Sequence, residues 1–101
     1  MAQFDVYKNE NELTSVRVPY LLDIQNDILN SLNTRVVIPL IRDIKDFKGL
    51  SKEFIIENFK VYLTPSQMGT VHINELKDKV TSLKNQQEDI KNSIDFLIYG
   101  F

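Results

Sequence analysis

The amino-acid sequence predicts a mainly β domain that is closed by one C-terminal helix. Apolar and polar residues alternate in several short segments before about residue 80, and from Ser82 onward the apolar residues recur at helical spacing. A length of 101 residues predicts a single domain over residues 1–101. This order of elements fits a small, strongly bent antiparallel sheet that packs against a helix of about residues 82–99.

The first two strands are expected on either side of an exposed polar loop. Residues 3–8 alternate as a half-buried strand does, and residues 9–14 are polar and turn-forming. Residues 16–24 alternate again, with Val16 as the first inward residue. Because Pro19 has no backbone N–H, we expect this second strand to lie at a sheet edge or to carry a bulge there.

The third strand is predicted to be buried on both faces. Residues 30–34 have the composition of a turn, and residues 35–41 then contain the apolar, β-branched run Val-Val-Ile-Pro-Leu-Ile. Proline cannot donate to a sheet hydrogen bond, so we expect a local interruption at Pro39.

Residues 42–58 allow two interpretations. Three apolar residues recur there at helical spacing, namely Ile44, Phe47 and Leu50. The run at residues 54–56, in contrast, has the composition of a strand. The pattern is clear again beyond this region, where residues 59–64 alternate, Pro65 marks a turn and residues 70–73 form a short strand.

The C-terminal helix is predicted to have two different sides. Its apolar stripe runs through Leu83, Ile90, Ile94, Leu97 and Ile98. At about 100° per residue, the part through Ile90, Ile94 and Leu97 can face the sheet. Phe96 and Tyr99 then lie on the other side beside Asp95, which indicates either a second packing surface or a binding patch. Ser82 is a plausible N-cap.

The last three residues, Tyr99-Gly100-Phe101, extend this second side of the helix. Gly100 is expected to end the helix and to let the chain turn, so that Phe101 reaches either the core or a partner. Chain ends are normally polar and frayed, and this one is apolar. The pattern therefore indicates an interaction surface, without saying what binds there.

Composition argues against a nucleic-acid binder, a metalloprotein and an enzyme. The net charge of −2 leaves no basic excess to neutralise phosphates. Without cysteine and with one histidine, neither a thiol nucleophile nor a conventional zinc site is expected, and three distant glycines build no phosphate loop. We therefore expect no cofactor and no metal. His72 is expected to face solvent from a short strand, with a general base as the alternative.

Hydropathy and the N-terminus predict a cytoplasmic protein without a membrane partner. The longest unbroken apolar stretch, residues 36–41, is far shorter than the roughly 20 residues that a membrane span requires. The first residues lack the basic and apolar regions of a signal peptide. Absence of cysteine suits a reducing cytosol.

Three segments carry a resemblance to a known family, namely residues 22–29 (LDIQNDIL), 34–40 (TRVVIPL) and 88–94 (EDIKNSI). In these segments the chain resembles the CcdB family, the toxins of plasmid and chromosomal toxin–antitoxin pairs. The start, residues 3–7 (QFDVY), and the chain length also match, whereas the similarity between about Arg42 and Phe59 is weak.

The resemblance implies an SH3-like barrel, shared with the Kid and MazF ribonucleases, and a homodimer whose terminal helices lie together. It implies a bacterial toxin that binds the A subunit of DNA gyrase and traps the enzyme with its DNA cleaved, without chemistry of its own. It also implies a CcdA-type antitoxin, and repression of the shared operon by the complex. Contact with DNA is then only indirect. No antitoxin-contacting residues are assigned.

The resemblance also implies which residues contact gyrase. The family's tail falls on Ile98, Tyr99, Gly100 and Phe101, with Asp95 one turn earlier. The pair Ile28 and Leu29 matches further positions that toxicity requires. The better-known members have tryptophan where this chain has Tyr99 and asparagine where it has Asp95. Tyrosine keeps a ring that can stack on an arginine guanidinium, with a smaller contact area than tryptophan.

Two other functions stay open. A ribonuclease on the same barrel would need an acid–base pair and an arginine beside the RNA phosphate, and Arg17, Arg35 and His72 are sparse candidates. The second alternative is a homologue that has lost toxicity and only binds the antitoxin.

Overall fold

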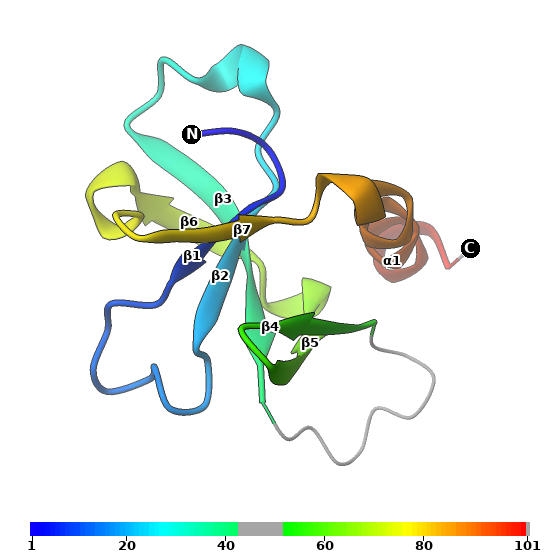
Figure 1. The fold of residues 1–101 in the computed structure, drawn as a ribbon. Coiled ribbons are helices and arrows are strands. Elements are labelled where there is room, and N and C mark those ends of the chain that lie inside the picture. The colour runs from blue at the N-terminus through cyan, green and yellow to red at the C-terminus, as the bar shows by residue number, and fades with distance from the viewer. Residues whose placement is uncertain (43–51, 101) are drawn as a thin grey trace.

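The computed structural model describes residues 1–42 and 52–100, which form a curled antiparallel sheet with one α-helix at its side (Figure 1). The strands are β1 (Asp5–Lys8), β2 (Tyr20–Asp23), β3 (Thr34–Ile41), β4 (Glu53–Ile56), β5 (Phe59–Leu63), β6 (Gly69–His72) and β7 (Lys79–Ser82). The helix α1 spans Gln87–Tyr99, and four short 3-10 turns are η1 (Asp27–Leu29), η2 (Pro65–Gln67), η3 (Ile73–Glu75) and η4 (Lys84–Gln86). The predicted mainly β fold with a C-terminal helix is confirmed.

The sheet curls around its longest strand, β3. The strands follow the order β4-β5-β3-β2-β1-β7, and β6 pairs separately with β3. On one edge of β3, residues 34–37 pair with β6 and residues 40–41 pair with β5. One long strand therefore belongs to two differently directed parts of the sheet, which gives a half-barrel.

Pro39 lies where β3 changes partner, and the strand continues through it. Its carbonyl accepts hydrogen bonds from the Thr64 hydroxyl (2.8 Å) and the Thr64 N–H (3.4 Å). The backbone nitrogen and carbonyl of one strand residue point to the same edge, so the missing N–H of Pro39 falls at the junction between β6 and β5. The expected interruption affects the pairing on that edge, while the strand itself is continuous.

The expectation of an edge strand or a bulge at Pro19 is wrong. Strand β2 begins after Pro19 and pairs with β1 on one side and β3 on the other. Val16 lies in the preceding loop and is exposed. Asn9 closes this loop through two hydrogen bonds. Its side-chain Nδ2 donates to the Val18 carbonyl, and its backbone N–H donates to the Pro19 carbonyl. Residues 9–14 contain no strand and are mostly exposed, as predicted.

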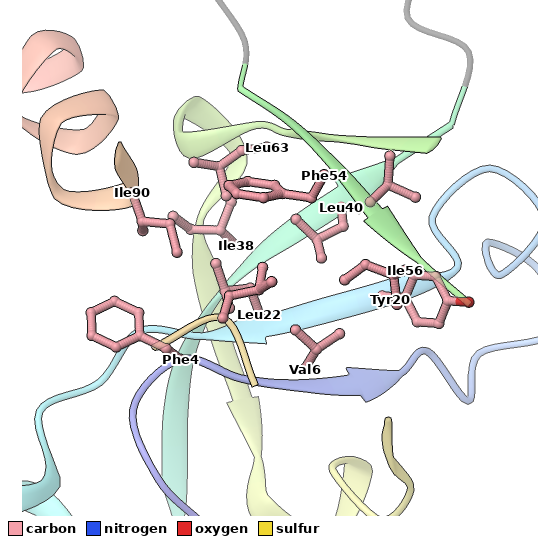
Figure 2. Close-up of a cluster of buried hydrophobic side chains, with 12 residues drawn as sticks. Phe4, Val6, Tyr20, Leu22, Ile38, Leu40, Phe54, Ile56, Leu63 and Ile90 are labelled. Carbon is pink, nitrogen blue, oxygen red and sulfur yellow. The ribbon is translucent and has the colours of Figure 1, made fainter. Parts of the chain in front are cut away.

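The core fills the concave side of the curled sheet (Figure 2). Most of its side chains come from the strands β1 to β5, and α1 contributes Ile90, which is 0 % exposed and points in among them. A smaller cluster on the other face of the sheet contains Tyr7, Val37 and Leu76. Strand β3 is thus buried on both faces, as its unbroken apolar run predicted.

Residues 53–63 form a β-hairpin, which decides between the two interpretations for the part of 42–58 that the structure describes. The residues at helical spacing, Ile44, Phe47 and Leu50, lie outside the described residues. Glu57 and Asn58 connect β4 to β5 and have φ angles of +51° and +69°. Two successive left-handed residues are characteristic of a type I′ turn, whose twist matches that of the paired strands.

Two predicted boundaries are shifted. Ser82 is the last residue of β7, where it pairs with Asp5, and α1 begins only at Gln87. The Ser82 hydroxyl accepts a hydrogen bond from the Lys84 N–H, and Leu83 is buried before the helix starts. The strand predicted at residues 70–73 is β6, one residue earlier. At residue 82, pairing of β7 with β1 therefore outweighed the local helical pattern.

Candidate functional site

The second half of α1 exposes a continuous set of large apolar side chains. They are Phe96, Leu97, Ile98 and Tyr99, the last with 65 % of its surface accessible. Scattered single apolar residues are normal on a protein surface, but four in succession on one helix end indicate an interaction surface.

Leu97 was predicted to pack on the sheet, and this prediction is wrong. Ile90 is fully buried and Ile94 packs partly against the same cluster, but Leu97, next in the stripe, is 46 % exposed. At 1.5 Å per residue the helix advances about 10 Å from Ile90 to Leu97. The end of α1 thus extends past the core. Figure 1 shows α1 at the side of the sheet.

The exposed end of α1 has two flanks. At about 100° per residue, Asp95, Ile98 and Tyr99 fall within an arc of about 100° on the side away from Ile90. Asp95 and Tyr99 are one turn apart on this arc, so their side chains are neighbours. Phe96 and Leu97 lie outside this arc: Leu97 is on the side of Ile90, and Phe96 is about 60° from Tyr99. The structure therefore brings three of the predicted gyrase contacts together.

Gly100 ends the helix, as predicted. It has a φ of +78°, in the left-handed region, and its N–H donates to Phe96 O at 3.0 Å. A Cβ at this position would have no heavy atom within 4 Å, so a substitution would be opposed by the backbone conformation and not by crowding. Phe101, another predicted contact, lies outside the described residues.

The second predicted pair, Ile28 and Leu29, lies in the turn η1. Ile28 is 87 % exposed, and Leu29 and the nearby Leu32 are also exposed. Asn26 caps η1 by accepting a hydrogen bond from the Ile28 N–H (2.9 Å). In Figure 1 the loop that contains η1 and the helix α1 lie apart. One chain thus presents the predicted site residues on two separate surfaces.

Beneath η1 lies a buried ionic cluster that no local sequence pattern predicted. Arg35 in β3 is 1 % exposed, and its Nε donates to Asp23 Oδ2 in β2 at 2.8 Å. Burial raises the pKa of the Asp23 carboxyl, and the hydrogen bond from Arg35 opposes that rise. The available signal was a pair of opposite charges within two otherwise apolar, adjacent strands.

Two of the three sparse candidates for ribonuclease chemistry, Arg35 and His72, have structural roles. All three nitrogens of the Arg35 guanidinium are occupied within the fold, so it does not face an RNA phosphate. His72 is exposed, as predicted, and its Nδ1 accepts a hydrogen bond from the Asn74 N–H as the cap of η3. Among residues 1–42 and 52–100 there is no group of three or more acidic or histidine side chains suited to a metal.

No helix in the described part of the chain is long and apolar enough to cross a membrane.

In a comparison with known protein families, the family model described as "CcdB protein" matches residues 3–100. The match includes the curled sheet, the η1 loop and α1 up to Gly100. Members of this family are toxins of toxin–antitoxin systems that inhibit DNA gyrase and do not act as catalysts. On this match, which covers nearly all of the sequence, the chain belongs to the CcdB family of gyrase-poisoning toxins.

Proposed function

We propose that this chain is the toxin of a type II toxin–antitoxin system in the bacterial cytoplasm. It binds the A subunit of DNA gyrase and traps the complex in which the DNA is cleaved. The observation that carries the proposal is the exposed arc of Asp95, Ile98 and Tyr99 at the end of α1, in a member of a family of gyrase poisons. The turn η1, with Ile28 and Leu29, contributes a second contact.

The proposed mechanism needs no chemistry by the toxin. A ligand that binds one conformation of an enzyme more tightly than the others increases the population of that conformation. If the toxin prefers the open form with cleaved DNA, religation is blocked and the cleaved form accumulates. The free energy of toxin binding to gyrase therefore drives the accumulation of cleaved DNA, and the toxin needs to catalyse no reaction.

Tyr99 and Asp95 together suit an arginine of gyrase. A guanidinium that stacks on the Tyr99 ring gains a cation–π interaction, and the carboxylate one turn away can accept hydrogen bonds from the same group. The smaller ring of tyrosine loses contact area compared with tryptophan, and the carboxylate of Asp95 compensates through charge. We therefore expect the chain to be toxic, although it has Tyr99 where the better-known members have tryptophan and Asp95 where they have asparagine.

The flank of α1 that contains Phe96 and Leu97 fits a homodimer contact. Both side chains are about half exposed and lie outside the proposed gyrase arc, which Phe96 borders at Tyr99. A twofold contact between identical helices would bury these side chains against their copies. The dimer would then present two copies of the arc to a gyrase that itself contains two copies of its target chain.

The remaining partner is a CcdA-type antitoxin, and with it the toxin represses its own operon. This part of the proposal follows from family membership. Contact of the toxin with DNA is indirect, through the antitoxin or through gyrase.

The test combines purified toxin, gyrase and supercoiled plasmid, followed by detergent and protease. We expect linear DNA that depends on both gyrase and toxin. Absence of linear product at saturating toxin would refute the gyrase proposal. In that case, cleavage of RNA in a parallel reaction would point to the ribonuclease, and binding of the antitoxin alone would point to a non-toxic homologue.

A further inference from the structure

We propose that Arg35 is a positioning residue, which acts through Asn30 and Gln25 to hold η1 in the conformation that presents Ile28 and Leu29 to gyrase. This inference rests on the proposed function, because it gives a structural reason for the geometry of one of its two contact surfaces. Arg35 itself is buried, so it can influence gyrase only through the residues that it contacts, which also include Asp27 of η1 at 3.7 Å.

The guanidinium of Arg35 joins three segments around the loop. Nε donates to Asp23 Oδ2 (2.8 Å), Nη2 donates to the carbonyl of Gln25 (3.2 Å), and Nη1 donates to the side-chain oxygen of Asn30. Gln25 precedes η1 and Asn30 follows it directly. One rigid, planar group therefore fixes both ends of the turn relative to β2 and β3.

The Gln25 side chain adds a second set of bonds from inside the fold. Its Nε2 donates to the carbonyls of Leu29 and Thr34, each at 3.2 Å, and its Oε1 accepts from the Val36 N–H at 3.1 Å. Leu29 is thus held through its backbone, which leaves its side chain outward. A third link comes from the chain start, where the Gln3 N–H donates to Asp27 Oδ1 at 2.8 Å.

These bonds are needed because η1 cannot position itself. It has three residues and no buried side chain, and Ile28 is almost fully exposed, so apolar packing does not fix the turn. The cluster costs free energy through desolvation, as the raised pKa of the Asp23 carboxyl shows. Buried ionic groups can select one conformation out of several, and here the selected conformation is that of an exposed apolar turn.

The mildest test changes the exposed end of the network. Asn30→Ala removes the acceptor for Nη1 while Asp23 and Arg35 stay paired. The matched control is Asn33→Ala in the same loop, because Asn33 bonds to the Ile73 N–H through its backbone carbonyl, which alanine retains. We expect Asn30→Ala to weaken binding to the A subunit of gyrase roughly tenfold, a loss typical of one important interface position, and Asn33→Ala to leave it unchanged.

A double-mutant cycle with Ile28→Ala separates positioning from direct contact. If Asn30 acts through the presented side chain, Asn30→Ala should weaken binding much less in the Ile28→Ala background. Amide hydrogen exchange of residues 26–30 in the free toxin should be faster in Asn30→Ala and unchanged in Asn33→Ala. Fully additive losses of affinity, or unchanged exchange, would overturn the inference.

Arg35→Lys provides a second variant. Lysine can keep the charge beside Asp23 but cannot reach Gln25 and Asn30 at the same time. We expect a folded protein with fast exchange in the loop and weakened gyrase binding. If wild-type toxin binds gyrase and Arg35→Lys binds equally well, the positioning role is wrong. If wild-type toxin does not bind gyrase, the proposed function itself fails.

Discussion

At the scale of single residues, the hydroxyl of Tyr20 ties the centre of the sheet to the β4–β5 hairpin. It donates a hydrogen bond to Glu57 Oε1 at 2.6 Å, across 37 positions of sequence. Burial is the main cause that raises the pKa of Tyr20 to about 12, and the hydrogen bond and charge of Glu57 add to it. The bond also helps to hold Glu57 at its positive φ, which a non-glycine residue rarely adopts.

Tyr20 should make the stability of the protein depend on alkaline pH. The folded chain retains the Tyr20 proton up to about pH 12, whereas the unfolded chain releases it near the ordinary pKa of 10. This stabilisation is complete below pH 10 and is lost as pH rises towards 12. We expect the free energy of unfolding to fall less steeply over this window in Tyr20→Phe, as measured by urea unfolding at fixed pH values. The pKa of Tyr7 is also raised to about 12, so Tyr7 contributes part of this pH dependence in both proteins. Equal slopes of the free energy of unfolding against pH in the two proteins would contradict the assignment to Tyr20.

At the scale of elements, the hairpin and the helix are held in different ways. The hairpin depends on a two-residue turn, in which Glu57 and Asn58 are both left-handed. The helix depends on Ile90, which lies in the core, and in part on Ile94, which packs against it; an exposed ion pair of Asp89 with Lys52 (3.7 Å) adds little. The exposure of the last residues of α1 is therefore a consequence of where the core ends.

The turn geometry can be tested at Asn58. A β-branched residue is strained in the left-handed region, at a cost of about 1–2 kcal/mol, whereas glycine adopts it without strain. We expect Asn58→Val to lower the free energy of unfolding by about that amount and Asn58→Gly to change it little. Thermal and denaturant unfolding of both variants measures this. A similar loss in both would mean that the side chain of Asn58 matters, and not its φ.

The sequence predicted those elements in which one local pattern dominates. An unbroken apolar run identified the strand at residues 35–41, alternation identified the strand at residues 59–64, and Gly100 marked the end of the helix. Local pattern did not predict features that depend on residues far apart in the sequence. Ser82 belongs to β7 because it pairs with Asp5, and Leu97 is exposed because the sheet does not extend as far as this residue. Opposite charges in two apolar strands were the only signal of the Asp23–Arg35 pair, because the pairing of residues 12 positions apart depends on strand register, which no local period reveals.

At the scale of the whole molecule, the described chain leaves much apolar surface uncovered. The end of α1 exposes four large side chains in succession, and η1 exposes Ile28 and Leu29. A short chain buries a limited share of its surface, so association commonly covers the remainder. On our proposal a second copy covers one flank of α1 and gyrase binds the other.

The dimer proposal predicts a shift in oligomeric state. Phe96→Asp places a charge on the flank that faces the second copy, where desolvation would oppose burial. We expect the wild-type chain to sediment as a dimer at micromolar concentration and the variant to sediment as a monomer, with far-ultraviolet circular dichroism unchanged. Glu88→Gln, near the start of α1, serves as the control and should remain dimeric. A monomeric wild-type chain at every concentration would contradict the proposal.

The central claim is that the exposed arc at the end of α1 poisons gyrase. The most direct measurement is the amount of gyrase-dependent linear DNA formed by the wild-type chain, Tyr99→Ala and Glu88→Gln at equal concentration. Glu88 lies on the same side of α1 as Tyr99 but about 16 Å along the helix. We predict abundant linear DNA with the wild-type chain and Glu88→Gln, and at least tenfold less with a folded Tyr99→Ala. Equal cleavage by all three proteins would contradict the account.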